Sequence, residues 1–248
     1  MLGAEQFDRL VVVLVRARNP NNIGAAARAM HDFGFRHLRV VNDYTVPFET
    51  ARSAVDASAV IANARGCTSV AEAIADCTLV VGTTAVGERA LQHPLLALPE
   101  AEERIRGEIS SEAGRVALLF GSEKTGLSND ELSHCHWLLT IPMQGHEARR
   151  HPSMNLGQAV AVCLYELVRR AGVHEGTGVP QRAETAEVER FLEIFREMLE
   201  KTGYTRRHPA NCDEAQVRRL ILRMGLAAND VPVWMGIVRQ ALWKVRGA

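Results

Sequence analysis

The 248-residue sequence is long enough to bury a large core, either as one α/β domain or as a domain of about 150 residues with an appendage. Its 29 basic and 29 acidic residues cancel, which excludes a globally charged surface for nucleic acid or membranes, so any basic surface must be local. The sequence has five cysteines but no Cys-x-x-Cys pair, which predicts a reducing compartment and no metal site. Its start lacks a signal-peptide pattern, and no apolar run approaches the roughly 18 residues of a membrane span. We therefore expect a cytoplasmic protein with no membrane segment.

The first 143 residues alternate short β-branched runs with helical patterns. Strands are expected at 11–15, 37–41, 78–82, 116–121 and 138–143. Helices are expected at 23–33, 53–64, 70–75, 99–109 and 129–134. Continuous apolar strands are typical of a sheet buried on both faces, so the expected fold class is α/β, with a parallel sheet covered by helices.

The rest of the chain is expected to be helical. A long helix at 154–171 closes the α/β domain, and the Gly- and Pro-rich stretch that follows it has no periodicity. Three further helices, at 184–203, 214–225 and 233–245, show apolar spacings of three and four. The expected division is therefore an α/β domain at 1–172, a linker at 173–184 and a helical extension at 185–248.

The loop at 121–128, with the sequence GSEKTGLS, directly follows a predicted strand. A glycine-bounded loop after a strand is where open parallel sheets bind ligands. Its spacing approaches that of a phosphate-binding P-loop, but Leu127 stands where the P-loop needs lysine, and Lys124 lies inside the loop, where it cannot replace that contact. The sequence therefore argues against nucleotide triphosphate hydrolysis, and the absence of G-x-G-x-x-G leaves a dinucleotide enzyme without support.

Two more loops, at 82–85 and 141–155, also follow predicted strands. All three loops are rich in small residues and backbone groups. They can offer amide and carbonyl groups to a flat polar heterocycle while aliphatic neighbours cover its faces. This combination is typical of a site for an adenosyl group.

Three motifs occur in order along the chain. The first is N-x-G-x-x-x-R, with Asn22, Gly24 and Arg28; the second is G-x-E-x-x-G-L, which starts at Gly121; the third is I-P-M at 141–143 with S-x-N-L from Ser153. Together they resemble the motifs of the SpoU-type methyltransferases of the SPOUT superfamily, over about residues 8–172. The helical tail is similar to the extension of the TrmJ-like branch, which methylates the ribose 2′-hydroxyl of an anticodon-loop nucleotide in tRNA.

The resemblance implies a trefoil-knotted α/β domain that acts as a homodimer on S-adenosylmethionine (SAM), without a metal. It implies tRNA as partner and nucleotide 32, a cytidine or uridine, as the target. The cofactor site that it implies comprises Thr83, Thr84, Ala85, Gly121, Ile141, Pro152, Ser153 and Met154. The catalytic set that it implies comprises Asn22, Arg28, Glu123, Ser153 and Asn155.

The first motif also has a physical rationale. Gly24 and Arg28 share one face of the predicted helix, while the sheet is faced by Ile23, Ala26, Ala27 and Met30. Methyl transfer to a hydroxyl is an in-line displacement, so the nucleophile must be held in line with the methyl carbon. Because a guanidinium does not deprotonate in proteins, Arg28 is expected to grip the adjacent phosphate and to stabilise the developing alkoxide. A substrate phosphate oxygen and water remain candidates for the proton acceptor.

Structural roles stay open for the same residues. Asn22 can equally be an N-cap and Gly24 a packing glycine. Glu123 can equally cap the helix after its loop, and Ser153 and Asn155 are ordinary residues for a helix start.

The basic surface is also open to two interpretations. Residues 201–248 hold nine basic and three acidic residues, which favours RNA binding, but some of these arginines can instead pair with the acidic helix near 184–200. Arg149 and Arg150 are either a solvated loop or an RNA contact. The alternative functions are an rRNA 2′-O-methyltransferase and a non-catalytic RNA-binding SPOUT protein.

Overall fold

The computed structural model describes residues 3–42, 57–85, 91–144, 154–169 and 181–246. Within them, seven parallel strands form one sheet in the order β3-β2-β1-β6-β4-β7-β5. The strands are β1 (Leu10–Val15), β2 (His37–Val41), β3 (Arg65–Cys67), β4 (Leu79–Thr83), β5 (Leu95–Ala97), β6 (Val116–Phe120) and β7 (Trp137–Thr140). The helices around the sheet are α1 (Ala4–Phe7), α2 (Pro20–Asp32), α4 (Ser58–Ala62), α5 (Val70–Ile74), α6 (Leu98–Ser110), α7 (Asn129–Ser133) and α8 (Leu156–Arg169). The α/β class with a parallel sheet is confirmed.

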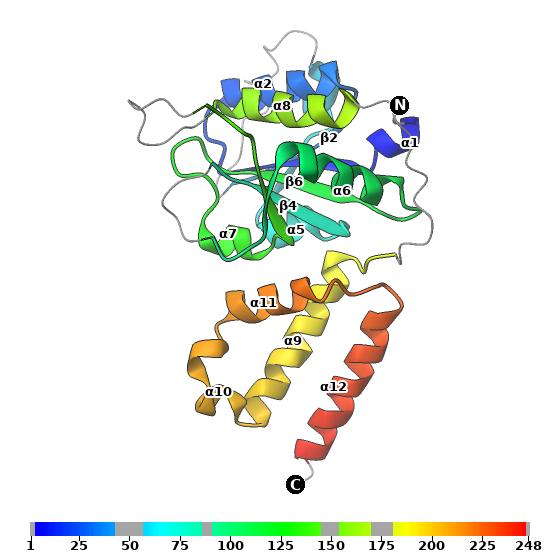
Figure 1. Cartoon of the computed structure of the whole chain (residues 1–248), viewed down its shortest axis with the longest axis vertical. Coiled ribbons are helices and arrows are strands. Elements are labelled where there is room, and N and C mark those ends of the chain that lie inside the picture. The colour runs from blue at the N-terminus through cyan, green and yellow to red at the C-terminus, as the bar shows by residue number, and fades with distance from the viewer. Residues whose placement is uncertain (1–2, 43–56, 86–90, 145–153, 170–180, 247–248) are drawn as a thin grey trace.

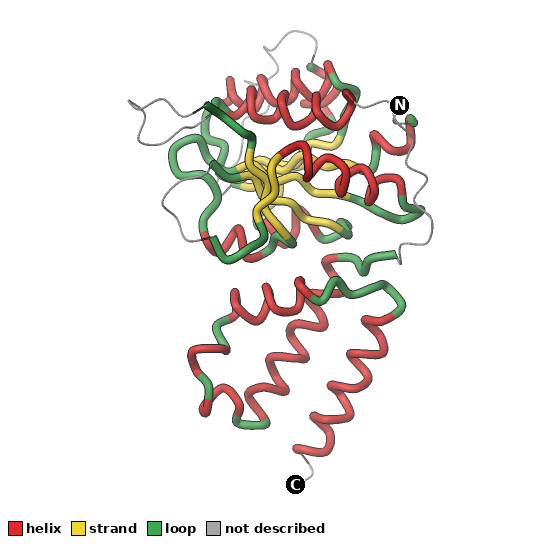
Figure 2. Tube along the Cα trace, in the orientation of Figure 1, coloured by secondary structure: helices red, strands yellow, loops and turns green. Residues whose placement is uncertain are grey.

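Strand β1 shows why the sheet is buried on both faces. All six of its residues are buried, and successive side chains point to opposite faces. Leu10, Val12 and Leu14 join the core beneath α2, α4, α6 and α8. The alternate valines join a second core, against α5 and α7. Figure 1 shows these two layers, with α2 and α8 above the sheet and α5 and α7 below it, and Figure 2 shows the strands enclosed between them.

All five predicted strands are present, but the sheet has two more. Strands β3 and β5 have three residues each and lie at the two edges of the sheet. The predicted strand at 138–143 was too long, because β7 ends at Thr140. The ladder with β5 also ends at Thr140, and Pro142, which has no N–H, cannot extend a ladder. Ile141 therefore opens a loop.

Two helix starts differ from the prediction for reasons of capping. Helix α2 begins at Pro20, not at residue 23, because the side chain of Asn19 accepts a hydrogen bond from the Asn21 N–H and Pro20 fits the first turn. Helix α8 begins at Leu156, because Asn155 Oδ1 accepts hydrogen bonds from the backbone N–H groups of Gly157 and Gln158. Helix α4 lies within the helix predicted at 53–64, of which residues 53–56 are outside the described residues. Residues 170–171 of the helix predicted at 154–171 are also outside them.

The tail consists of α9 (Thr185–Lys201), α10 (Tyr204–Arg207), a 3-10 turn (Pro209–Asn211), α11 (Glu214–Arg223) and α12 (Asp230–Arg246). It has its own apolar core, which contains Phe191 and Ile221. The three longer helices were predicted; α10 and the short turn were not. Figure 1 shows the tail below the α5 and α7 side of the sheet.

Backbone hydrogen bonds join the tail to the α/β domain. The N–H groups of Thr185 and Ala186 donate to the carbonyl oxygens of Cys77 (2.9 Å) and Ala75 (3.1 Å). Arg218 on α11 donates to the Ser133 hydroxyl of α7 at 3.1 Å and is buried. The tail is therefore packed against the domain at the start of α9 and along α11.

In the described part of the chain, no helix is long and apolar enough to span a membrane. All five cysteines are free, and only Cys212 is not buried. Burial raises the pKa of Cys77 and Cys163 to about 12, so these thiols stay protonated at neutral pH.

Candidate active site

The three predicted ligand loops leave adjacent strands. Strands β6, β4 and β7 are neighbours and parallel, so their carboxyl ends lie along one edge of the sheet. Hydrogen bonds tie the end of β4 and the loop after it to both neighbours: Thr83 Oγ1 donates to Leu119 O at 2.9 Å, and Thr84 N donates to Leu139 O at 3.0 Å. The Thr83 hydroxyl therefore holds strands together, and this loop offers backbone groups at Ala85, which is exposed.

The loop after β6 folds back on itself. Gly126 N donates to Ser122 O at 2.8 Å, and Gly126 has a φ of +65°, in the left-handed region that favours glycine. A Cβ on Gly121 would lie 2.2 Å from the Gly126 carbonyl carbon and from the Leu127 nitrogen. Only glycine at position 121 allows this close turn, which leaves the backbone of the loop free to approach a ligand.

Glu123 is exposed in the turn of this loop. It does not cap the following helix, which was one of the two roles open to it. Helix α7 is capped instead by Ser128 and Glu131: Glu131 N donates to Ser128 Oγ (3.2 Å), and Ser128 N donates to Glu131 Oε2 (2.6 Å). Glu123 is thus available to a ligand.

The first and third motifs meet where α2 packs on α8. Asn22 is not the N-cap of α2; its Oδ1 accepts a hydrogen bond from Asn155 Nδ2 at 3.4 Å. Asn155 also caps α8, so the structural role open to it is real and coexists with this contact. A Cβ on Gly157 would lie 2.6 Å from the Ala25 Cβ, which shows how closely the two helices approach. The structure therefore brings Asn22 and Asn155 together although they are far apart in sequence.

The other predicted residues fall into three groups. Arg28 is exposed on α2, and among the described residues it has no hydrogen-bond or ion-pair partner, whereas Ile23, Ala26, Ala27 and Met30 are fully buried against the sheet as expected. Ile141 and Met154 are half-buried at the two ends of the third loop. Pro152 and Ser153 lie outside the described residues, as do Arg149 and Arg150.

Arg16, a residue that the sequence did not single out, contacts the loop after β6. It is the first residue after β1 and has a φ of +55°, the one positive value among the described non-glycine residues. Its guanidinium donates to both carboxylate oxygens of Glu131 (2.6 and 2.9 Å) and to Gly126 O (2.9 Å). The only signal in the sequence was a cation placed directly after a buried strand.

These loops fit the cofactor that the resemblance implies. The turn at Gly121 is a cradle that a Cβ would fill, and the half-buried Ile141, after β7 at the same edge of the sheet, supplies apolar surface. An adenosyl group is recognised by backbone amides and apolar cover, which this edge of the sheet provides. Among the described residues no group of three His, Cys, Asp or Glu side chains is placed to hold a metal ion.

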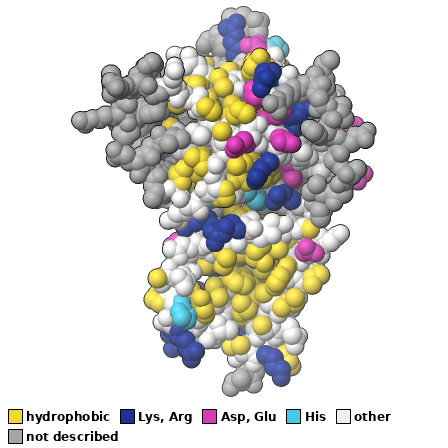
Figure 3. Space-filling view, viewed as in Figure 1, with side chains coloured by type: hydrophobic (Ala, Val, Ile, Leu, Met, Phe, Trp, Pro, Cys, Tyr) yellow, Lys and Arg dark blue, Asp and Glu magenta, His cyan; other side chains and the backbone are white. Residues whose placement is uncertain are grey.

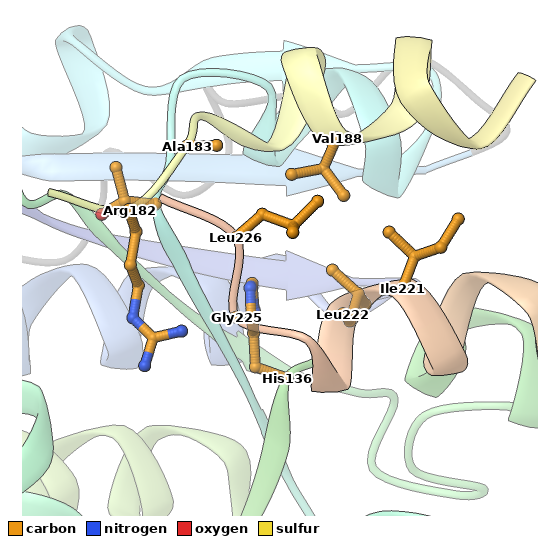
Figure 4. Close-up of a pocket in the computed structure, with 9 residues that line it drawn as sticks. His136, Arg182, Ala183, Val188, Ile221, Leu222, Gly225 and Leu226 are labelled. Carbon is orange, nitrogen blue, oxygen red and sulfur yellow. The ribbon is translucent and has the colours of Figure 1, made fainter. Parts of the chain in front are cut away.

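A separate small pocket lies at the junction with the tail, lined by His136, Arg182, Val188, Ile221 and Leu226 among others (Figure 4). Thr78 and His136, which also line it, precede β4 and β7, so the pocket is at the amino edge of the sheet, opposite the three loops. Burial and the charge of Arg182 lower the pKa of His136 to about 3, and its Nδ1 accepts a hydrogen bond from Val80 N at 3.0 Å. We regard this pocket as part of the junction.

The tail uses some of its basic residues internally. Arg218 pairs with Glu189 (3.1 Å) and Glu214 (2.8 Å), and Arg246 pairs with Glu197. Glu189 and Glu197 belong to the acidic helix, so the alternative of internal pairing holds for these arginines. Among residues 201–246, six exposed basic residues have no ion pair within the described part of the chain: Lys201, Arg206, Arg207, Arg223, Arg239 and Lys244.

Comparisons with known proteins agree with this geometry. The sequence model of the SpoU rRNA Methylase family matches residues 9–165. The tRNA (cytidine/uridine-2′-O-)-methyltransferase TrmJ of Pectobacterium atrosepticum is 35% identical over 241 residues, which cover 94% of this chain and 96% of that protein. The tRNA (cytidine-2′-O-)-methyltransferase TrmJ of Methanocaldococcus jannaschii is 29% identical over 221 residues, 88% of this chain and 94% of that protein.

Solved structures are similar as well. TrmJ from Z. mobilis ZM4 superposes with a TM-score of 0.77 at 29% identity, covering 93% of this chain and 97% of that one. A structure concerned with 2-OH methylation of C/U34 on tRNA has a TM-score of 0.50 at 27% identity, covering 66% of this chain and 96% of that one. The first similarity includes the tail.

Proposed function

Because the chain belongs to the SpoU rRNA Methylase family, we propose that it transfers a methyl group from SAM to a ribose 2′-hydroxyl in tRNA. The observation that carries the proposal is the gathering of the motif loops at the carboxyl ends of β6, β4 and β7, beside the α2–α8 contact. The TrmJ relatives, which match nearly the whole chain, support tRNA as the substrate. The trefoil knot that the resemblance implies is expected with the family.

SAM would be held by the residues of the three loops: Thr83, Thr84, Ala85, Gly121, Ile141, Pro152, Ser153 and Met154. When bound, it supplies an electrophilic methyl group on a sulfonium. In this proposal Gly121 lets the loop backbone approach the adenosyl group, and the short contacts of Thr83 and Thr84 with Leu119 and Leu139 keep the loops in register. No metal is proposed, so EDTA is expected to leave cofactor binding unchanged.

The proposed catalytic set is Asn22, Arg28, Glu123, Ser153 and Asn155. Arg28 would bind a phosphate beside the reacting ribose and stabilise the alkoxide as it forms, because its guanidinium is exposed and permanently charged. The Asn22–Asn155 hydrogen bond would fix the first turn of α2 against the start of α8. The two amides thereby keep the ends of the first and third motifs together.

The target nucleotide is a finer proposal. We propose nucleotide 32 of the anticodon loop, as cytidine or uridine, by analogy with the TrmJ-like branch; position 34, the subject of one similar structure, is the competitor. Purified protein with labelled SAM and bulk tRNA should incorporate label, and nuclease mapping should place it at 32. Label at 34 would correct the position, label only in rRNA would favour that alternative, and no label in any RNA would favour a non-catalytic binding protein.

We propose that residues 185–248 are the tRNA-binding extension of a domain at 1–172, with a linker between them. The six exposed basic residues at 201–244 that have no ion pair within the described residues support this role, and Figure 3 shows dark blue side chains above and below the apolar surface of the tail. Because the proposed substrate is tRNA, we propose that the protein acts in the cytoplasm.

We also propose a homodimer, supported by apolar side chains that the tail exposes. Eight of the ten exposed large apolar residues in the described part of the chain lie in the tail. Figure 3 shows a broad apolar surface on one face of the tail. On α12, Asp230, Trp234, Ile237, Ala241 and Lys244 recur at spacings of four and three, along one stripe. Two copies of α12 packed antiparallel near Ile237 would place each Asp230 beside the Lys244 of the second copy.

Light scattering tests this pairing. Trp234→Glu should weaken the contact between tails, whereas Trp243→Glu, which changes a more exposed tryptophan outside the stripe, should leave it intact. If the measured mass and its dependence on protein concentration are the same in both variants as in the wild type, pairing through α12 is contradicted.

A further inference from the structure

Arg16 occupies a backbone conformation that L-residues avoid. Its φ of +55° is in the left-handed region, which costs a residue with a Cβ free energy that glycine does not lose. Its N–H still donates to Val41 O at 2.8 Å, so the residue ends β1 within the sheet before the chain turns. Such a conformation persists where surrounding contacts over-determine it.

The Arg16 side chain contacts the loop after β6 and the helix that follows it. Nε and Nη2 bind the two oxygens of Glu131 at 2.6 and 2.9 Å, Nη2 also donates to Gly126 O at 2.9 Å, and Nη1 donates to Thr125 Oγ1 at 3.3 Å. The pair with Glu131 is bidentate, the arrangement that fixes orientation most strongly. The side chain therefore connects the end of β1 to both sides of the turn at Gly126.

Glu131 links this contact to the conformation of the loop. Its Oε2 accepts from Arg16 and also from Ser128 N, the cap of α7. Burial alone would raise the pKa of the Glu131 carboxyl, but the hydrogen bonds from Arg16 and Ser128 outweigh burial and hold the pKa below its usual range. The carboxylate thus stays charged and keeps both partners. The loop is fixed at one end by Gly121 and at the other by Arg16 through Glu131.

We infer that Arg16 is a positioning residue that holds the 121–127 loop in the conformation that binds the cofactor. The inference rests on the proposed function, in which this loop contacts SAM. Arg16 would act through Gly126 and Glu131, without touching the cofactor itself.

Arg16→Gly is the most informative variant, because glycine adopts a positive φ without strain while the guanidinium is lost. We expect an unfolding midpoint within about 5 °C of the wild type. We expect the affinity for S-adenosylhomocysteine, measured by calorimetry, to fall about tenfold, as displacement of a positioned group by a fraction of an ångström would cause. The KM for SAM should rise, and the KM for tRNA should stay the same.

Limited trypsin digestion gives a second readout that needs no cofactor. Lys124 is exposed at the tip of the loop, so a loosened loop should be cut after Lys124 faster in Arg16→Gly, as followed by mass spectrometry. Glu131→Gln should also speed cleavage after Lys124. The double variant should be cut no faster than Arg16→Gly, because both changes break the same Arg16–Glu131 contact. Arg65→Ala on β3, which removes a surface ion pair of 2.9 Å with Glu72 of α5, is the matched control.

The outcomes separate the two proposals. Unchanged S-adenosylhomocysteine affinity and unchanged cleavage in Arg16→Gly would overturn the inference, as would equal effects in Arg65→Ala. Loss of affinity only in proportion to a loss of folding stability would assign Arg16 a purely structural role and also overturn it. A wild-type protein that does not bind S-adenosylhomocysteine would overturn the proposed cofactor. In that case, faster cleavage after Lys124 in Arg16→Gly would show only that Arg16 stabilises the conformation of the loop.

Discussion

Arg28 and Arg16 show how differently two arginines are used in one site. Arg28 is exposed and has no partner among the described residues, as expected of a group that waits for an RNA phosphate. Arg16 is bound to Glu131 and Gly126. The motif order in the sequence pointed to Arg28. Nothing in the sequence distinguished Arg16 from a solvated cation, because its role depends on a loop that begins about a hundred residues later.

Arg28→Ala should abolish methyl transfer, by about 100-fold or more in kcat, because the charge that stabilises the developing alkoxide is lost. The affinity for S-adenosylhomocysteine and the unfolding midpoint should stay the same, since the side chain is exposed. Arg28→Lys should fail nearly as badly, because an ammonium lacks the bidentate fork. Arg36→Ala, an exposed arginine just after α2, is the control, and near-normal turnover in Arg28→Ala would refute the role.

Asn155 combines two tasks that conservative variants can separate. Asn155→Ala should cost about 1 kcal/mol of stability, because the cap of α8 is lost. Asn155→Asp keeps an oxygen for the cap but loses the Nδ2 donor to Asn22, so it should fold normally and methylate more slowly. Urea denaturation and turnover measure the two effects. If Asn155→Asp turns over at the wild-type rate, the only role left for Asn155 is to cap α8.

At the scale of elements, the sequence predicted the strands that carry continuous β-branched runs and missed those that do not. Strands β3 and β5 are short edge segments whose pairing is set by their neighbours, so no local pattern marks them. The start of α2 was predicted three residues late, because Asn19 and Asn22 look alike in sequence and only the fold shows which one caps. The candidate loops were predicted correctly as strand ends, since parallel strands bring their carboxyl ends together.

The loop after β6 depends on a glycine that the backbone requires. Gly121→Ala would place a Cβ 2.2 Å from the backbone of Gly126, so the loop must open and binding of S-adenosylhomocysteine should be lost. Gly107→Ala is the matched control, because no atom lies within 4 Å of a Cβ there and alanine should stabilise α6 by about 0.5–1 kcal/mol. Calorimetry and thermal unfolding of the two variants test this; retained binding in Gly121→Ala would contradict the proposed cradle.

At the scale of the whole molecule, the tail and the α/β domain meet through a buried, neutral histidine. The folded-state pKa of His136 is about 3 against an ordinary value of 6.5, so between these pH values the unfolded chain binds a proton that the folded chain excludes. Its contribution to stability is therefore complete above pH 6.5 and is lost as the pH falls. The expected slope is about 1.4 kcal/mol per pH unit for this one group. His93, with a pKa of about 4, acts in the same direction.

Urea unfolding at pH 7, 6 and 5 checks this prediction. His136→Gln should reduce the slope of the unfolding free energy against pH by the amount that one titrating proton contributes, because glutamine does not titrate. Glutamine can still accept the hydrogen bond from Val80 N. His31→Gln, at an exposed position on α2, should leave the dependence as it is. A wild-type stability that does not change between pH 7 and 5 would contradict a neutral buried His136.

The basic residues of the tail are expected to set the salt dependence of tRNA binding. Each lost phosphate contact should reduce the log–log slope of affinity against salt by about 0.7–0.9. Arg206→Gln with Arg207→Gln should therefore flatten the slope, whereas Arg104→Gln, an exposed arginine of α6, should not. Binding measured between low and moderate salt tests this, and an unchanged slope would show that these two arginines face solvent.

The central position of β1 has a consequence for synthesis on the ribosome. Leu10 pairs with Val116, so β1 has no partner on one side until β6 has been made. At about 5–20 residues per second, an uncharged, six-residue strand edge stays open for roughly 5–20 s in each nascent chain. Such an edge can pair with the same edge of a neighbouring chain on the same message. We therefore expect chaperone supply and translation speed, more than the stability of the finished protein, to decide how much of it a cell accumulates.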